Sequence, residues 1–182
     1  MRQEVSSPVS FRVNVARLSR NGVLVTVEAD DEQRTALAVA HGLLSVETYR
    51  AELSVRAWKR NGVSVQGRVT ADITQECVVT LDPLPARIDA DVSAVFLPED
   101  SKLGREGFGS GGEILIDTEG DDAPETFSGD FIDVGALAEE FFGLAIDPYP
   151  RRSDAELPSV DAETREVDGP LQRKLRLITG KN

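Results

Sequence analysis

Strict alternation of apolar and polar residues marks the middle of the chain. From Tyr49 to Ala57, and again from Val63 to Ile73, every second residue is small or apolar while most of its neighbours are polar or charged. A period of two is typical of a β-strand with one buried face and one solvated face. Asn61-Gly62 separates the two runs, and this dipeptide favours a tight hairpin turn. The pattern therefore predicts a long antiparallel hairpin.

Three further runs extend the expected sheet. The segment from Ile88 to Phe96 repeats the period of two. Near the start of the chain, Val9–Val15 and Val23–Glu28 are strand candidates. The dipeptide Asn21-Gly22 between them predicts a second hairpin. We expect a twisted antiparallel sheet of about six strands, either open or curled toward a barrel.

Two segments have the pattern of an amphipathic helix. The first begins at Asp30, whose side chain can cap a helix, and Gln33 completes a capping box. The second begins at Asp133 and is expected to end near Gly143. Strands that dominate the chain together with two helices define an α+β fold. The expected buried face of the second helix consists of Val134, Leu137, Phe141 and Leu144.

The chain divides into one domain and a tail. We expect a single α+β domain over residues 1–152, interrupted at about 98–128 by a mobile glycine-rich and acidic insertion with one short strand at Ile114–Ile116. Residues 153–182 form a polar, flexible tail. The tail ends in a short basic amphipathic segment, Leu171–Ile178, which we expect to order only on contact.

Composition narrows the class of protein. The formal net charge is −12, with 32 acidic and 20 basic residues, so the chain as a whole repels nucleic acid and suits a basic protein partner. No apolar run is long enough to cross a membrane and no signal-peptide pattern is present, which predicts a cytoplasmic protein. Cys77 is the sole cysteine, so it can form neither an intrachain disulfide nor a thiolate zinc cluster, and we expect it to be buried.

Several residues invite a chemical interpretation that their context does not support. His41, the sole histidine, has no nucleophile motif beside it. The glycine-rich loop Gly104–Gly112 lacks the Lys-Ser/Thr pair of a phosphate-binding loop, and the acidic run Asp117–Asp122 lacks the spacing of a calcium loop. Glu139 and Glu140 are neighbours on a helix and diverge. We therefore expect no catalytic residue, no cofactor, no metal and no small-molecule substrate; a cation-dependent hydrolase is the weakest alternative.

One group of basic residues favours a different function. Alternation places Arg50, Arg56 and Arg68 on the solvated side of the sheet, with Arg60 at the turn. If these side chains gather, they could contact RNA phosphates despite the acidic total charge. Direct RNA binding through a basic patch on this face is therefore an alternative function.

The segment Asp130–Arg151 reads Asp-Phe-Ile-Asp-Val-Gly-Ala-Leu-Ala-Glu-Glu-Phe-Phe-Gly-Leu-Ala-Ile-Asp-Pro-Tyr-Pro-Arg. It resembles the signature of the YceD family, the large ribosomal RNA subunit accumulation proteins, in the form found in the alphaproteobacterial branch. The stretch from Val65 to Leu84 resembles a second part of the family pattern. Many relatives carry a second cysteine where this chain has Thr80, so no metal or redox role is carried over to Cys77.

The resemblance implies a non-enzymatic part in the accumulation or maturation of large-subunit ribosomal RNA. We expect large-subunit ribosomal proteins or precursor particles as partners, with contact to the RNA itself as a further option. The prolines at 148 and 150 keep the segment from Asp147 to Arg152 extended, as a strap. Its candidate partner-binding residues are Asp147, Tyr149, Arg151 and Arg152.

Overall fold

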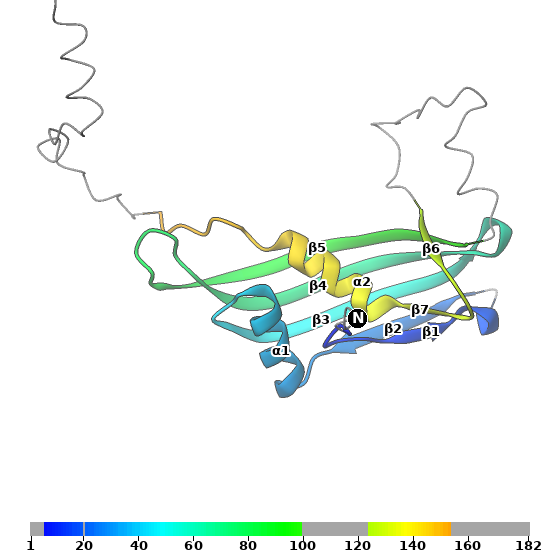
Figure 1. Ribbon diagram of the computed structural model, residues 1–182, viewed down its shortest axis with the longest axis horizontal. Coiled ribbons are helices and arrows are strands. Elements are labelled where there is room, and N and C mark those ends of the chain that lie inside the picture. Colours follow the sequence, from blue (N-terminus) through cyan, green and yellow to red (C-terminus); the bar gives the residue numbers. More distant parts are fainter. Residues whose placement is uncertain (1–5, 20, 100–123, 154–182) are drawn as a thin grey trace, which may run out of the picture.

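The computed structural model describes residues 6–19, 21–99 and 124–153. Its main element is a five-stranded sheet with the order β2-β3-β4-β5-β6, and a two-stranded ribbon of β1 and β7 accompanies it (Figure 1). The strands are β1 (Arg12–Asn14), β2 (Val23–Glu28), β3 (Ser45–Trp58), β4 (Gly62–Glu76), β5 (Pro83–Pro98), β6 (Glu125–Phe127) and β7 (Phe131–Asp133). The helices are α1 (Asp31–His41) and α2 (Val134–Ala145), with short 3-10 turns at Val15–Arg17 and Lys59–Asn61.

The long hairpin that alternation predicts is confirmed, and it is longer than expected. β3, β4 and β5 have 14, 15 and 16 residues and pair antiparallel along nearly their whole length. Alternate residues of β3 and β4 are buried, among them Leu53, Val65 and Val69, which are at most 2% exposed. The strands are curved, but β2 and β6 at the two edges do not pair with each other, so the sheet is open and not a barrel.

The turn between β3 and β4 differs from the expected two-residue turn. Trp58 pairs with Gly62, and the residues between them form a 3-10 turn. Asn61 takes the left-handed conformation with φ of 64°, whereas Gly62 is the first residue of β4. Asparagine tolerates this conformation better than most residues, so the dipeptide marks the turn correctly, although only Asn61 takes a positive φ.

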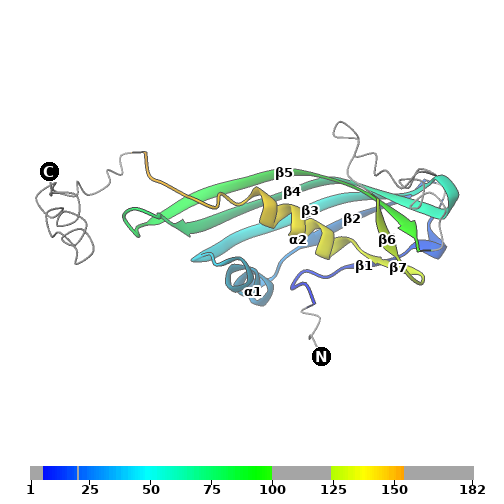
Figure 2. The same ribbon diagram turned by 45° about the horizontal axis from the view of Figure 1, so that its top comes forward.

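Both helices and the β1–β7 ribbon lie on one face of the sheet (Figure 2). No described helix or strand covers the other face, which we call the bare face. α1 begins as predicted, because Asp30 accepts from the Gln33 amide and Gln33 accepts from the Asp30 amide. α2 continues to Ala145, past the expected end at Gly143. Its buried face also differs: Phe142 is fully buried, Phe141 is only partly buried and Leu144 is 76% exposed.

The start of the chain does not form the predicted hairpin. β1 is confined to Arg12–Asn14 and pairs with β7, more than a hundred residues away, instead of with β2. Gly22 has a positive φ of 76° and turns the chain, but it joins two strands that lie in different sheets. The partner of β1 is thus a strand far away in the sequence, and the hydrophobic pattern of β1 alone does not indicate which strand that is.

Asp133 connects the N-terminal segment to α2. Its carboxylate caps α2 by accepting from the Ala136 amide at 2.9 Å, and it also accepts from the Phe11 amide at 2.9 Å and from the Ser10 hydroxyl. Directly beyond the cap, Gly135 lies against the backbone of Val9. One carboxylate and one glycine thus hold two remote parts of the chain together over the sheet.

Part of the expected insertion is ordered. Glu125–Phe127 forms β6, which pairs parallel with the last three residues of β5 and is the one parallel pairing in the described sheet. The short strand expected at Ile114–Ile116, the acidic run Asp117–Asp122, and residues 154–182 lie outside the described residues.

The contact at Gly135 generates a test of the fold. A Cβ atom there would lie 1.9 Å from the Val9 carbonyl oxygen and 2.5 Å from the Phe11 nitrogen, both backbone atoms. Helix propensity alone favours alanine by about 1 kcal/mol, but we expect Gly135→Ala to lower the free energy of unfolding by about 2–3 kcal/mol in urea denaturation.

Gly143→Ala is the matched control on the same helix. Its new methyl group would meet the edge of the His41 ring at 2.9 Å, and a side chain can move aside. We expect a change of within about 1 kcal/mol. A Gly135→Ala protein as stable as the parent would show that α2 does not depend on this close approach.

Candidate interaction surface

The bare face of the sheet carries three of the four candidate arginines. Arg50 and Arg56 lie on β3 and Arg68 lies on β4, all on the solvated side, as alternation predicts. The side chain of Arg60 lies outside the described residues, although its backbone belongs to the turn between these strands.

Carboxylates surround these arginines. Arg50 forms ion pairs with Glu28 on β2 and Glu52 on β3, while Arg56 donates from Nε to the Ser54 hydroxyl at 3.1 Å. The Arg68 Nε lies 3.3 Å from Asp89 Oδ1, and its Nη2 lies 3.1 Å from Asp91 Oδ1. On the described strands, arginines and carboxylates share this face: Arg50, Arg56, Arg68 and Arg87 against Glu28, Glu47, Glu52, Asp72, Glu76, Asp89 and Asp91.

The ion pairs weigh against a concentrated positive field. The side chains of each pair are about half exposed or more, so these pairs contribute little to folding. The ion pairs matter more for binding than for stability. Each carboxylate reduces the positive potential of its arginine, and therefore the attraction of that arginine for a phosphate group. The face is therefore a mixed-charge surface.

The second candidate region lies at the far end of the sheet, where the β4–β5 turn meets the strap at Asp147–Arg152. Gln75 is 6% exposed and donates from Nε2 to the Asp147 carbonyl oxygen at 2.8 Å. The Val78 amide donates to the Pro150 carbonyl oxygen at 3.0 Å. These bonds fasten the strap to the turn, and we call the combined surface, residues 77–82 and 147–152, the strap surface.

The strap surface combines charged side chains with exposed apolar side chains. Arg152 Nη1 lies 3.1 Å from Asp82 Oδ2, and the Asp147 carboxylate accepts from the Tyr149 amide at 2.9 Å. Leu81 and Tyr149 are 66% and 70% exposed, although both are large and apolar in body. The strap surface thus presents apolar groups between fixed charges, a composition found in many protein contacts.

Cys77 is buried, as expected, but by the local turn and not by the main core. The Cys77 amide donates to the Asp82 carbonyl oxygen and the Leu81 amide donates to the Cys77 carbonyl oxygen, both at 2.9 Å. The Thr80 hydroxyl, together with the backbone amides of Thr80, Arg152 and Val79, lowers the pKa of the Cys77 thiol to about 7. The turn therefore favours a negative charge on this sulfur.

His41 helps to pack the two helices together. Its Nε2 lies 3.2 Å from Glu139 Oε1, and its ring contacts Phe142 edge-on at a centroid distance of 5.1 Å. Phe142 contacts Tyr49 in the same way at 5.4 Å. Burial, and secondarily the Glu139 charge, raises the pKa of Tyr49, whose hydroxyl has no hydrogen-bond partner among the described residues. The group joins α1 to α2 and to β3.

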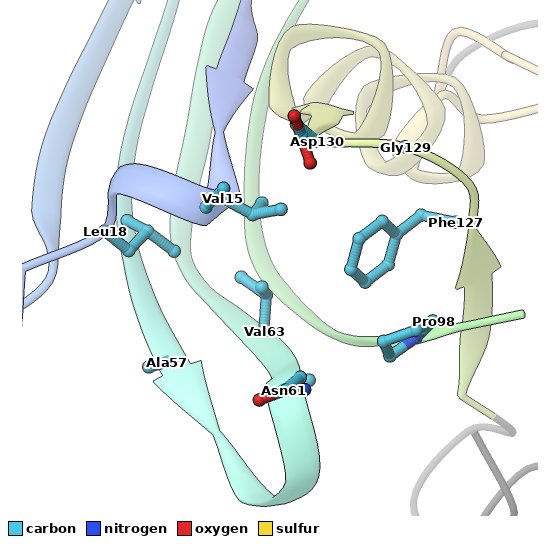
Figure 3. Close-up of a pocket in the computed structure, with 11 residues that line it drawn as sticks. Val15, Leu18, Ala57, Asn61, Val63, Pro98, Phe127, Gly129 and Asp130 are labelled. Carbon is cyan, nitrogen blue, oxygen red and sulfur yellow. The ribbon is translucent and has the colours of Figure 1, made fainter. Parts of the chain in front are cut away.

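A pocket of about 400 Å³ opens at the opposite end of the sheet from the strap surface, beside the β3–β4 turn (Figure 3). Val15, Val63 and the ring of Phe127 form its apolar walls, and among the described residues Asp130 is the titratable one that lines it. A hydrolytic site would need a nucleophile or a second acid or base beside this carboxylate.

No group of three or more histidine, cysteine, aspartate or glutamate side chains is placed to hold a metal ion within residues 6–19, 21–99 and 124–153. No helix in those ranges is both long and apolar enough to span a membrane.

Comparison with known proteins identifies the family. Residues 65–172, more than half of the chain, match the family model described as "Large ribosomal RNA subunit accumulation protein YceD". The chain therefore belongs to the YceD family, whose name indicates a role in ribosome biogenesis. A search of curated proteins and a search of solved structures each gave no significant match. The matched region starts within β4 and includes β5, α2 and the whole strap surface.

The structure adds residues that the sequence did not single out. Gln75 and Asp82 fasten the strap to the β4–β5 turn. Both lie in the stretch that resembles the family pattern, but their role depends on partners about seventy residues away, which the sequence does not indicate. Candidate residues Asp147, Tyr149, Arg151 and Arg152 all lie on the strap surface and are exposed. The two groups of candidates therefore occupy separate regions.

Gln75 provides a test of how the strap is held. Gln75→Ala removes a part-buried hydrogen bond to the Asp147 carbonyl oxygen, so we expect a loss of about 1 kcal/mol in the free energy of unfolding. The Val78 amide should also exchange faster with deuterium. Asp82→Asn, which weakens only an exposed ion pair, should cost at most about 1 kcal/mol. Equal exchange rates in Gln75→Ala and the parent would contradict this role.

Thr80 provides a test of the thiol environment. Thr80→Val removes the hydroxyl donor, so we expect the pKa of Cys77 to rise from about 7 toward the ordinary value of about 8.5, measured by thiolate absorbance. Thr70→Val, on the bare face of the sheet, is the control and should leave that pKa unchanged.

The same pKa shift predicts a pH dependence of stability. Because the folded-state pKa is the lower one, the thiolate stabilises the fold above about pH 8.5, and this contribution disappears as the pH falls through about 7. Thr80→Val should reduce the rise in urea midpoint over this interval. An identical rise in the variant would show that Thr80 does not act on the sulfur.

Proposed function

We propose that this protein is a non-enzymatic factor that supports the accumulation or maturation of large-subunit ribosomal RNA by contacting ribosomal proteins or assembly intermediates. The family match over residues 65–172 is the observation that carries this proposal. The cytoplasm, where such assembly proceeds in bacteria, is the proposed location.

Electrostatics favours a protein contact over an RNA contact. With a net charge of −12, the chain attracts basic proteins and repels polyphosphate at long range. Large-subunit ribosomal proteins are basic because they bind RNA, so they complement this charge. An acidic factor can hold such a protein until the RNA replaces it.

The strap surface is the proposed contact region. It lies within the family match, it is fastened to β4 through Gln75, and it exposes Tyr149 beside Asp147 and two arginines. Tyrosine and arginine are enriched where binding energy concentrates in protein interfaces. The family description names an accumulation factor, which agrees with the non-enzymatic proposal.

Direct RNA binding through Arg50, Arg56 and Arg68 is the second candidate function. The observation in its favour is that all three arginines lie on one bare sheet face. The carboxylates beside Arg50 and Arg68 weigh against it. If these arginines contact phosphates, the affinity for RNA should fall steeply as salt rises, because phosphate contacts release counterions; an affinity for RNA that does not fall would argue against this candidate.

Gene deletion tests the proposed function directly. We expect the ratio of large- to small-subunit ribosomal RNA to fall, and the parent gene should restore it. Tyr149→Ala should restore it less well, because it removes an exposed anchor from the strap surface, while Leu24→Ala, at an 82% exposed position on β2, serves as the matched control. A normal ratio in the deletion strain would refute the proposal.

A further inference from the structure

A groove of about 800 Å³ lies between α1, α2 and the N-terminal segment, away from the strap surface and on the helical side of the sheet. Val39 forms part of its wall and is 79% exposed, although it occupies the last turns of a well-capped helix. The residues that line the groove are Ser6, Ser7, Pro8, Glu32, Thr35, Ala36, Val39, Ala40, Ala136 and Glu139.

The walls of the groove are held in place. Gln33 donates from Nε2 to the Pro8 carbonyl oxygen at 2.9 Å, which fixes the N-terminal segment to α1. The close approach of Gly135 to Val9 fixes the same segment to α2. A groove with preset walls loses little conformational entropy when a ligand enters.

The shape suits an α-helix. Ala36 and Ala40 are one turn apart on α1, and Ala136 faces them from α2. Small side chains let the backbone of a third helix come close, and Val39 offers an apolar contact. Laying an amphipathic helix into such a groove is a recurring mode of peptide recognition.

The charge of the groove selects a basic ligand. Glu32 and Glu139 line it, and Glu139 is held by His41 at 3.2 Å with its side chain 15% exposed. Beyond these two, α1 and α2 carry Asp31, Glu140 and one arginine, Arg34, whose charge is offset by Asp31 at 2.5 Å. The helical side therefore attracts lysine and arginine and repels phosphate.

From the fixed apolar groove and its acidic lining, we propose that this groove binds a basic amphipathic helix of a protein partner. The inference rests on the proposed function in one respect, namely that such a helix comes from a ribosomal protein. The apolar stripe of the helix lies on Ala36, Val39 and Ala136, and its basic flank lies beside Glu32 and Glu139. The groove is a second contact, separate from the strap surface.

The test uses the full chain and a short fluorescein-labelled peptide of leucine and lysine in heptad order, whose helix has one apolar and one basic face. We expect binding, measured by fluorescence anisotropy, to weaken about tenfold or more in Val39→Lys. Leu144→Lys is the matched control, since Leu144 is equally exposed on α2 but does not line the groove, and the charge change is the same.

Four outcomes would overturn the inference. Equal weakening in Val39→Lys and Leu144→Lys would show that net charge alone governs binding. Equal affinity for a peptide of the same composition in scrambled order would show that no amphipathic helix is recognised. Tighter peptide binding in a chain with Leu175→Asp and Ile178→Asp would identify the basic segment of this chain as the natural occupant. A dimer in light scattering that Val39→Lys abolishes would identify a second copy.

The groove and the proposed function fail in distinguishable ways. If the deletion strain has a lowered ratio of large- to small-subunit RNA and the Val39→Lys gene restores that ratio fully, the ribosomal role stands and the groove takes no part in it. If the peptide binds with the expected selectivity while the deletion strain is normal, the groove is a helix-binding site and the ribosomal role fails. A deletion defect that Leu144→Lys corrects and Val39→Lys does not correct supports both.

Discussion

The fold depends on covering one face of a long sheet with very little material. β3, β4 and β5 present alternate apolar residues along 14 to 16 positions, and the described chain supplies only two helices and a short ribbon to cover them. Asp133 makes this possible, because its carboxylate caps α2 and binds the N-terminal segment at once. Gly135 then brings the two backbones into direct contact. The N-terminal segment and α2 are therefore joined directly to each other over the sheet.

Because so few elements cover the sheet, their positions determine which surfaces are open to partners. α2 crosses the sheet and passes into the strap, so the same helix borders the groove at Ala136 and Glu139 and delivers Tyr149 to the β4–β5 turn. On the bare sheet face each of Arg50, Arg68 and Arg87 is paired with carboxylates, whereas the helices carry carboxylates with a single arginine. Recognition of basic protein segments therefore belongs to the helical side and the strap surface, and the arginines of the bare face remain the alternative for RNA.

Features encoded by neighbouring residues could be predicted, and features that join distant residues could not. The capping box at Asp30 and Gln33, the cap at Asp133 and the alternation of β3 and β4 follow from local chemistry. The pairing of β1 with β7 and the bond from Gln75 to Asp147 are long-range and leave no periodic signal. The buried face of α2 was misplaced because two sets of apolar residues fit the helical period. The face that packs on the sheet runs through Leu137, Ala138 and Phe142, and Leu144 falls outside it. The apolar groove beside Val39 could not be anticipated either, since it requires three segments to meet.

β6 pairs with only the last three residues of β5, so in the described part of the chain most of β5 forms an open edge. An open edge of this length invites strand addition from another molecule and, with it, aggregation. Pro83 and Pro85 lack the amide hydrogens that such an addition needs, and Asp89 and Asp91 place negative charge along the same strand. These prolines and carboxylates therefore disfavour edge-to-edge pairing of two copies along β5.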